Sequence, residues 1–508
     1  MQIVGIGASA GGIEAFRLFF QAMPSNSGMG FVVVLHTSAD RKSMLPEILA
    51  RWTAMPVSEA ADGDRVGSDR VYVIPPGYVA TLHQGALQLR HLAPGVPREA
   101  TPIDEFFDSL AADLGENAIG VVLSGTGHDG ALGLKAIRAR GGLTLAQGSD
   151  GTVPQHSGMP DSAIATGAVD LIVSVQDMPG LIVAIHDRHE TADPVALSAL
   201  QTDTARLSIC EILFARVGHD FSQYKEATFL RRVQRRMQVL GLADIHAYIA
   251  KLEEDRGEPV LLFRDLLIGV TTFFRDAGAF EAVKQVVVPR LFDGKGADDQ
   301  VRVWVPGCAT GEEAYSLAIL LREHMDGLHD TPTVQVFATD IDEPAIGTAR
   351  AGRYPATLLQ GLSPERRDRF FVRQDNSYVV AKEVRDLCTF SAHSLVRDPP
   401  FSRMNLVSCR NLLIYMDVEL QASVIPAFHY SLLPGGVLLL GSAETVVRHD
   451  SLFASLEKEH RIFQRRDGPS PPLQTSARRP QNGPATPGKV SSDQENGQQS
   501  GRTDWPRT

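Results

Sequence analysis

The feature that most limits the possible folds is an alternation of short apolar runs with amphipathic stretches, which occurs in two separate parts of the chain. In the first part, apolar runs with the length of strands lie at 3–6, 31–35, 71–74, 119–123 and 143–146. Stretches with helical spacing lie between them, at 14–21, 43–51, 103–114 and 131–139. Strands that are apolar along their whole length are typical of a parallel sheet covered on both faces. We therefore predict an α/β domain with a doubly wound parallel sheet.

The same pattern returns after a helical segment. Residues 200–280 lack strand-like alternation, and strands are expected again at 301–305, 334–338, 405–408 and 437–440. A Tyr/Val-rich stretch at 378–380 indicates a small inserted antiparallel piece. The last 40 or so residues are polar and rich in Pro and Gly, which predicts disorder. The expected units are an α/β domain (1–180), a linker (181–200), an all-helical subdomain (201–282), a Rossmann-like α/β domain (283–466) and a tail (467–508).

Charge and cysteine content exclude several classes of protein. The 508 residues carry 49 Lys and Arg against 60 Asp and Glu, a net charge of −11, which argues against a protein that coats nucleic acid or an anionic membrane. The sequence has no apolar run of about 18 residues and no secretion signal, so we expect a cytoplasmic protein. The four cysteines are far apart in the sequence, which predicts neither a disulfide framework nor a metal site.

A glycine-rich turn follows the first expected strand and allows two interpretations. It matches the G-x-G-x-x-A dinucleotide fingerprint, but that motif needs an acidic residue after the second strand, where this chain has His36. The same turn can instead expose the hydroxyl of Ser9 at the carboxyl edge of the sheet. With His36 and Asp129 after neighbouring strands, a nucleophile, a general base and an orienting carboxylate would meet there. We favour hydrolysis, with backbone amides of 10–12 and 125–127 as the oxyanion site. Each residue alone is also consistent with a cap, a core histidine or a turn residue.

These residues belong to motifs that resemble the catalytic domain of the chemotaxis methylesterase family, CheB. The resemblance covers about residues 1–175 and rests on the following motifs: Ile6-Gly7-Ala8-Ser9-x-Gly11-Gly12, His36 followed by Lys42-Ser43, Val73-Ile74-Pro75-Pro76-Gly77, Gly125-x-Gly127-x-Asp129-Gly130 and Gly158-Met159-Pro160-x-Ser162-Ala163-Ile164. It implies that Ser9 is the nucleophile, His36 the base and Asp129 its orienter, acting on a glutamyl methyl ester. Glutamine deamidation stays open. The family's usual phosphoryl receiver does not precede Ser9, so we expect no control by phosphorylation of such a domain.

The second α/β pattern contains a possible nucleoside site. The expected strand 301–305 leads into a glycine-containing turn, 306–313, and the next strand ends at Asp340. A carboxylate at that position can bind ribose hydroxyls. The pattern alone suits a nicotinamide, a flavin or S-adenosylmethionine, and the acidic residues could also be helix caps.

Four motifs in this part resemble the chemotaxis receptor methyltransferase family, CheR, over about residues 205–465. The motifs are Gly269-Val270-Thr271-Thr272-Phe273-Phe274-Arg275-Asp276, Gly307-Cys308-Ala309-Thr310-Gly311-Glu312-Glu313-x-Tyr315-Ser316, Ala338-Thr339-Asp340-Ile341-Asp342 and Cys409-Arg410-Asn411-Leu412-Leu413-Ile414-Tyr415. The resemblance implies S-adenosyl-L-methionine as cofactor. It assigns nine positions to the cofactor site: Thr271, Arg275, Glu312, Asp340, Ser394, Leu395, Asn411, Leu412 and Tyr415. A substrate glutamate, with an ordinary pKa of about 4.3, is already an anion at neutral pH and needs no general base. Catalysis by positioning is therefore expected, without an essential histidine in this half.

Four arginines, Arg231, Arg232, Arg235 and Arg236, lie on overlapping i, i+4 rows of one expected helix. They form either a solvated face or a docking face for acidic substrate helices. The expected partners are methyl-accepting chemotaxis-type receptors with Glu-rich helices, with contact to the membrane only through those receptors. Nucleic acid is not expected as a partner, because the rest of the chain is acidic.

The sequence thus predicts a bifunctional enzyme that adds and removes methyl groups on receptor glutamates. One alternative is a signalling scaffold in which one or both sites are inactive, which the departures from the family patterns at Ala10, Gly269 and Ser394 leave open. Another is a methyltransferase that acts on small molecules or RNA.

Overall fold

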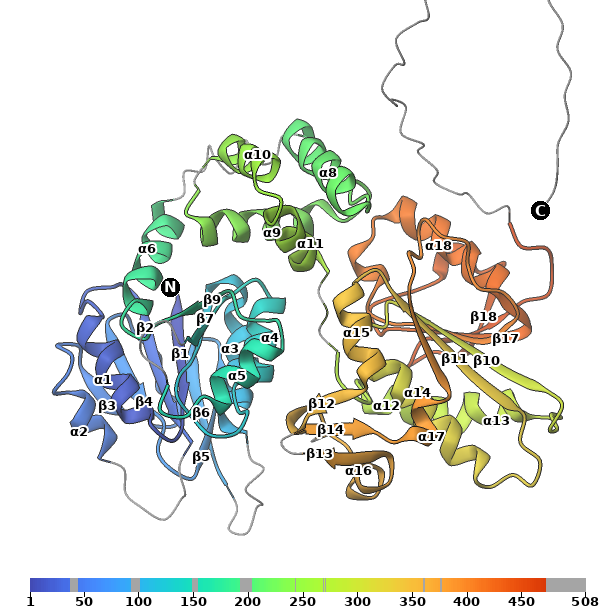
Figure 1. Cartoon of the computed structure of the whole chain (residues 1–508), viewed down its shortest axis with the longest axis horizontal. Helices are drawn as coiled ribbons and strands as arrows, with labels where there is room; N and C mark the ends of the chain where they lie inside the picture. Colours follow the sequence, from blue (N-terminus) through green and yellow to red (C-terminus); the bar gives the residue numbers. More distant parts are fainter. Residues whose placement is uncertain are drawn as a thin grey trace, which may run out of the picture.

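The computed structural model describes residues 1–36, 44–92, 101–148, 154–191, 203–242, 244–267, 269, 271–359, 361–374 and 377–471. The expected tail at 467–508 lies outside the described residues from 472 onward. Figure 1 shows two α/β domains and, next to both, a group of helices from the middle of the chain. The chain therefore has the three-part organisation expected from its sequence.

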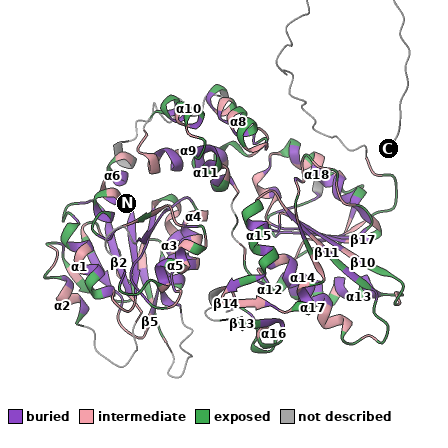
Figure 2. Ribbon diagram, viewed as in Figure 1, coloured by how far each residue is buried: buried purple, intermediate pink, exposed green. Residues whose placement is uncertain are grey.

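The first domain contains a seven-stranded sheet in the order β3-β4-β2-β1-β7-β8-β9, in which every pair is parallel. Its strands are β1 (Ile3–Ala8), β2 (Gly30–Leu35), β3 (Val57–Glu59), β4 (Arg70–Val73), β7 (Ala118–Val122), β8 (Leu143–Gln147) and β9 (Leu171–Val173). Strands β1, β2, β7 and β8 are buried along almost all of their length (Figure 2), as their apolar sequences predict. The doubly wound parallel sheet is confirmed.

Helices cover both faces of this sheet. They are α1 (Gly12–Ala22), α2 (Leu45–Leu49), α3 (Pro102–Leu114), α4 (Ala131–Ala139), α5 (Gly158–Ala165) and α6 (Met178–Thr191). One core cluster contains Phe16, Phe19 and Phe20 of α1, and a second cluster contains Phe106 and Phe107 of α3. A hairpin of β5 (Tyr78–His83) and β6 (Ala86–His91), which the sequence pattern did not indicate, packs on α3.

Helix α6 corrects the expected linker at 181–200. Its residues Met178, Ile182 and Ile185 lie in the core of the first domain, because their spacing places them on one face of the helix. The first domain therefore extends to Thr191. Residues 192–200 lie outside the described part of the chain.

The helical domain consists of α8 (Asp203–Val217), α9 (Glu226–Leu240), α10 (Ile245–Glu254) and α11 (Glu258–Leu266). Its own core includes Leu213, Phe221, Phe229 and Tyr248 and ends at Leu266. The expected boundary at 282 is therefore too late: Phe280, on α12 (Ala277–Ala282), packs into the core of the following α/β domain.

The second α/β domain has a seven-stranded sheet in the order β15-β11-β10-β16-β17-β19-β18. Its strands are β10 (Gln300–Pro306), β11 (Thr333–Asp340), β15 (Cys388–Ala392), β16 (Met404–Cys409), β17 (Leu432–Leu440), β18 (Phe453–Glu457) and β19 (Ile462–Arg465). The first five strands in space are parallel, and β19 and β18 are antiparallel additions at one edge. The Rossmann-like domain is confirmed.

Helices and a small sheet complete this domain. The helices are α12, α13 (Val288–Phe292), α14 (Glu312–Met325), α15 (Glu343–Ala351), α16 (Pro364–Phe370), α17 (Lys382–Arg385) and α18 (Val418–Ser431). A π-helical turn, Val283–Val287, joins α12 to α13. Strands β12 (Arg353–Pro355), β14 (Ser377–Val380) and β13 (Phe371–Gln374) form an antiparallel sheet, as expected around 378–380. Within the described residues, we find no helix with the length and apolar character needed to cross a membrane.

Candidate active sites

The first site lies where the strand order of the first sheet reverses. Strand β1 pairs with β2 on one side and with β7 on the other, so these three strands end at the same edge. Ser9 follows β1, His36 follows β2, and Asp129 lies in the loop after β7, directly before α4. Ligand sites in open α/β sheets favour this edge. The structure therefore brings the three predicted side chains to one place.

The imidazole and the carboxylate of this group face each other. His36 Nδ1 lies 3.4 Å from Asp129 Oδ2, and the Asp129 side chain is 4% exposed against 35% for His36. The Ser9 hydroxyl donates a hydrogen bond to the backbone oxygen of His36 at 3.2 Å. The buried carboxylate thus faces Nδ1 of the ring, which leaves Nε2 as the nitrogen available to act as a base.

Asp129 is itself held by the start of α3. Its two oxygens accept hydrogen bonds from the amides of Ile103 (3.1 Å) and Asp104 (2.9 Å). In return, the Asp104 carboxyl accepts a hydrogen bond from the Gly133 amide (2.7 Å) in the first turn of α4. Burial and the nearby charge of Asp129 raise the pKa of Asp104 well above its ordinary value. The role of Asp104 could not be predicted from the sequence, because nothing in the local pattern separates it from an ordinary helix-start residue.

Two of the amides expected in an oxyanion site already have acceptors. The Gly12 amide donates to the Ser9 backbone oxygen at 2.9 Å, and the Gly125 amide donates to the His156 backbone oxygen at 3.0 Å. Both bonds stabilise the turns around Ser9. The remaining candidates for the oxyanion site are therefore the other backbone amides of 10–12 and 125–127.

The second site lies where the strand order of the second sheet reverses, at β10. The turn after β10 has positive φ at Gly307 (71°), Ala309 (47°) and Gly311 (98°), and α14 begins at Glu312. The Asp340 carboxylate, at the end of the neighbouring β11, accepts hydrogen bonds from the amides of Ala309 (2.8 Å) and Asp342 (2.9 Å). Burial raises the pKa of Asp340, although these bonds oppose the shift. The carboxylate is thus fixed beside the turn.

Glu312 is fully buried below this turn. The Thr310 hydroxyl lies within hydrogen-bonding distance of both Glu312 carboxylate oxygens, at 2.8 and 2.7 Å. Burial raises the pKa of Glu312, while the charge of Lys135 on α4 of the first domain and the contact with Thr310 lower it. Glu312 is therefore held beside the turn by its contact with Thr310.

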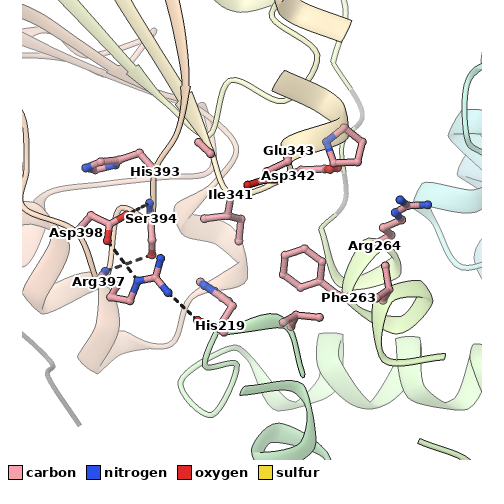
Figure 3. Close-up of a pocket in the computed structure, with 15 residues that line it drawn as sticks. His219, Phe263, Arg264, Ile341, Asp342, Glu343, His393, Ser394, Arg397 and Asp398 are labelled. Carbon is pink, nitrogen blue, oxygen red and sulfur yellow. Dashed lines mark hydrogen bonds and ion pairs between the residues drawn. The ribbon is translucent and has the colours of Figure 1, made fainter. Parts of the chain in front are cut away.

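Two adjoining cavities open beside Ile341 and Asp342, with volumes of about 410 and 100 Å³, and Asp340 lines the smaller one. Both are bordered by His219 of the helical domain and by Ile341, Asp342, His393 and Ser394 of the α/β domain, and Figure 3 shows the larger one. Six of the nine residues expected at the cofactor site line the smaller cavity: Asp340, Ser394, Leu395, Asn411, Leu412 and Tyr415. Thr271, Arg275 and Glu312 are not part of its lining. Residues from well-separated parts of the sequence, from His219 of the helical domain to Tyr415, thus meet here.

The donor set suits S-adenosylmethionine. The Asp340 carboxylate can accept hydrogen bonds from two ribose hydroxyls, and Ile341, Leu395 and Leu412 offer apolar surface to a flat ring. The Tyr415 side chain lies near Arg275, whose charge opposes the rise that burial causes in the pKa of Tyr415.

Two residues that support this site, Glu444 and His219, have no sequence pattern that predicts their role. The Glu444 carboxylate accepts hydrogen bonds from the amides of Asn411 (3.0 Å), Leu413 (2.7 Å) and Gly441 (2.6 Å). Burial lowers the pKa of His219 to about 4, so its ring is neutral at neutral pH, and its Nε2 lies 3.1 Å from the Tyr224 hydroxyl. A lone glutamate and a lone histidine give no pattern that could have identified them.

The basic helix differs from the expected docking face. Arg232, Arg235 and Arg236 are 1%, 4% and 6% exposed, and of the four predicted arginines Arg231 alone is exposed. Arg236 forms an ion pair with Glu258 of the same domain at 2.7 Å. Arg232 and Arg235 lie against the first domain, so in this structure these three buried arginines are not open to a partner.

Comparison with known proteins identifies the families of these domains. Residues 4–182 match the family described as CheB methylesterase, 207–267 match the all-alpha domain of CheR methyltransferase, and 269–462 match its SAM binding domain. An uncharacterized 104.1 kDa protein of Rhodobacter capsulatus is 37% identical over 444 residues, which are 83% of this chain and 46% of that protein. The chain thus spans about half the length of that relative.

Two shorter relatives match the C-terminal part. Cher3 of Pseudomonas putida is 34% identical over 278 residues, which cover 53% of this chain and 99% of that protein. The chemotaxis protein methyltransferase of Listeria monocytogenes is 31% identical over 235 residues, which cover 46% of this chain and 86% of that protein.

Proposed function

Because the chain belongs to the CheR methyltransferase family and carries a CheB methylesterase domain, we propose that it is a bifunctional enzyme with opposing activities. The N-terminal domain hydrolyses glutamyl methyl esters on receptors, and the C-terminal part transfers methyl groups from S-adenosylmethionine to receptor glutamates. The observation that carries the proposal is the presence, in one chain, of a Ser/His/Asp group and a cavity bordered by Asp340, each where a strand order reverses.

In the esterase, Ser9 is the nucleophile. Its hydroxyl leaves the His36 carbonyl by rotation about its side-chain torsion and donates to Nε2 of the His36 ring. The ring takes the proton while Ser9 Oγ attacks the ester carbonyl, and it returns the proton to the departing methanol. Asp129 stabilises the resulting imidazolium through Nδ1. Water then attacks the acyl group on Ser9 with the same proton transfers through His36, which releases the glutamate and restores the Ser9 hydroxyl.

In the methyltransferase, the chain binds and aligns the reactants. The cofactor supplies an electrophilic methyl group. Asp340 would hold its ribose, and the buried Glu312 would support the turn after β10 through its contact with the Thr310 hydroxyl. Arg275 and Tyr415 orient the acceptor carboxylate, which is already ionised at neutral pH. No residue needs to remove a proton from the acceptor.

The acceptors are glutamates on acidic helices of chemotaxis-type receptors. The enzyme would work in the cytoplasm, on the parts of receptors that lie there. Deamidation of receptor glutamine would use the same Ser9 group.

Transfer of labelled methyl from S-adenosylmethionine to receptor cytoplasmic fragments tests the proposal. Net labelling should rise in Ser9→Ala, which cannot remove the methyl group, and vanish in Asp340→Ala. S-adenosylhomocysteine should raise the melting temperature of wild type and not of Asp340→Ala. Stabilisation without labelling in any variant would favour a scaffold over an enzyme.

A further inference from the structure

The basic face of α9 is occupied by the end of one helix of the esterase domain. Arg232 donates from Nη1 to the backbone oxygen of Arg138 at 2.8 Å and from Nη2 to that of Ala139. These are carbonyls in the last turn of α4, where the helix dipole places partial negative charge. Arg235 Nε donates to the backbone oxygen of Gly142 at 3.3 Å. Two of the four arginines thus bind backbone oxygens of the esterase domain.

A buried ion-pair network reinforces this contact. Asp170 of the esterase domain pairs with Arg235, and Asp265 of α11 pairs with both Arg235 (2.8 Å) and Arg138 of α4. The side chains of Asp170, Asp265 and Arg235 are 1%, 0% and 4% exposed. Although burial opposes it, Arg235 and Arg138 hold the pKa of Asp265 below its ordinary value. Asp170 is thus a carboxylate from another domain bound to the basic face.

This contact lies next to the methyltransferase cavity. The Lys225 amide, directly before α9, donates to the backbone oxygen of Tyr415 at 2.9 Å, and Tyr415 lines the cavity. Arg232 follows seven residues later, about 10 Å along the helix. The charge of Arg232 acts on Tyr415, where it opposes the rise in the pKa of Tyr415 that burial causes. An acidic helix that reached the cavity along α9 would therefore meet the esterase domain.

We propose that the basic face of α9 is a shared docking surface, bound by the esterase domain in the closed state seen here and by the acidic acceptor helix during methylation. The inference rests on the proposed function, which supplies the acidic acceptor. Asp170 occupies on Arg235 the place of an acceptor carboxylate, and the end of α4 supplies further negative charge. The esterase domain is then a competitive inhibitor built into the chain.

The test uses the full chain and two esterase-domain variants, Asp170→Asn and Arg138→Met. Each removes one charge from the interface and leaves every residue of the cofactor cavity in place. Arg140→Met is the matched control, because Arg140 lies two residues from Arg138 but is exposed and pairs with Asp108 on the esterase surface. Ester hydrolysis and binding of S-adenosylhomocysteine report on the folding of each variant.

Competition predicts a particular kinetic change. The apparent affinity for the acceptor equals the intrinsic affinity multiplied by the fraction of molecules in which the esterase domain has left α9. Both variants should raise this fraction, and should therefore lower KM for a receptor fragment with kcat unchanged. We expect a fall of about tenfold, which corresponds to about 1.4 kcal/mol. Binding of a fluorescent glutamate-rich receptor peptide should tighten by the same factor. Arg140→Met should behave as wild type.

The outcomes separate the two proposals. Methylation with the same KM and peptide affinity in all four proteins would overturn the shared surface and leave the proposed function standing. Tighter peptide binding in both variants without methyl transfer in any protein would support the shared surface and overturn the methyltransferase. A weaker peptide affinity in both variants would also overturn the shared surface, since it would show that the contact helps docking.

Discussion

Replacement of Glu444 gives a direct test of how the cofactor loop is held. The Glu444 carboxylate is 4% exposed and accepts hydrogen bonds from the amides of Asn411, Leu413 and Gly441, at 3.0, 2.7 and 2.6 Å. Asn411 has φ 59°, a backbone conformation that needs support from its surroundings. The carboxylate thus fixes a strained turn that borders the cofactor cavity.

The magnitude follows from the number of amides left without an acceptor. A buried amide that loses its partner costs about 1–3 kcal/mol, so Glu444→Ala, which breaks three hydrogen bonds to backbone amides, should lower the free energy of unfolding by at least about 3 kcal/mol. Glu444→Gln keeps one acceptor oxygen but turns an NH₂ group toward the remaining donors, so about 2 kcal/mol is expected. Release of the turn should also weaken binding of S-adenosylhomocysteine by at least about tenfold.

Urea unfolding and calorimetric titration with S-adenosylhomocysteine measure the two effects. Glu457→Ala is the matched control, because Glu457 accepts hydrogen bonds from the amides of Glu459 and His460 at a half-exposed hairpin that does not line either cavity. The reasoning is refuted if Glu444→Ala binds the ligand as tightly as wild type, or if the two alanine variants lose the same stability.

Three further changes give measurable results. In Gly125→Ala the new methyl carbon would lie 2.1 Å from Met159 Sδ, so we expect about 1–3 kcal/mol lower stability and slower ester hydrolysis in activity assays. Gly180→Ala, in helix α6 with nothing within 4 Å of the new carbon, should raise stability by up to about 1 kcal/mol and leave ester hydrolysis unchanged. The pKa of Asp104 is raised in the folded state, so the contribution of Asp104 to the free energy of unfolding falls as pH rises above the pKa of about 4 that this group has in the unfolded chain. Urea titrations should therefore show a smaller decline in stability above about pH 4 in Asp104→Asn than in wild type. Burial lowers the pKa of His219 from 6.5 to about 4, so the contribution of the neutral His219 ring to the free energy of unfolding is lost as pH falls from 6.5 to 4. In urea titrations, wild type should therefore lose about 2–3 kcal/mol of stability between pH 7 and 4.5 that His219→Gln retains.

The sequence predicted those parts of the structure that depend on local pattern. Continuous apolar strands such as 31–35 and the glycine-rich turns after β1 and β10 were enough to predict two parallel sheets and to bring Ser9, His36 and Asp129 together. The sequence of α6 predicts a linker because it has few large apolar residues, but three of them reach the core.

Long-range contacts could not be predicted in the same way. The spacing of Arg232 and Arg235 indicates one helix face, but a single-chain sequence does not say which other element covers that face. Asp170 and the end of α4 are reached only after the chain has folded, and they are far from α9 in sequence. Glu444 was missed for the same reason, since its three partners are backbone amides, which have no sequence signature.

The contact between α4 and α9 forms inside one chain, and this affects how an outside ligand can break it. Covalent connection holds the two surfaces at an effective concentration on the order of millimolar. Dilution of the protein therefore cannot separate them, and a lone acceptor at micromolar concentration would compete poorly. Many acceptors held together on one surface would reach a local concentration comparable to this effective concentration. The closed contact would then make the methyltransferase respond to the crowding of its acceptors rather than to their total amount.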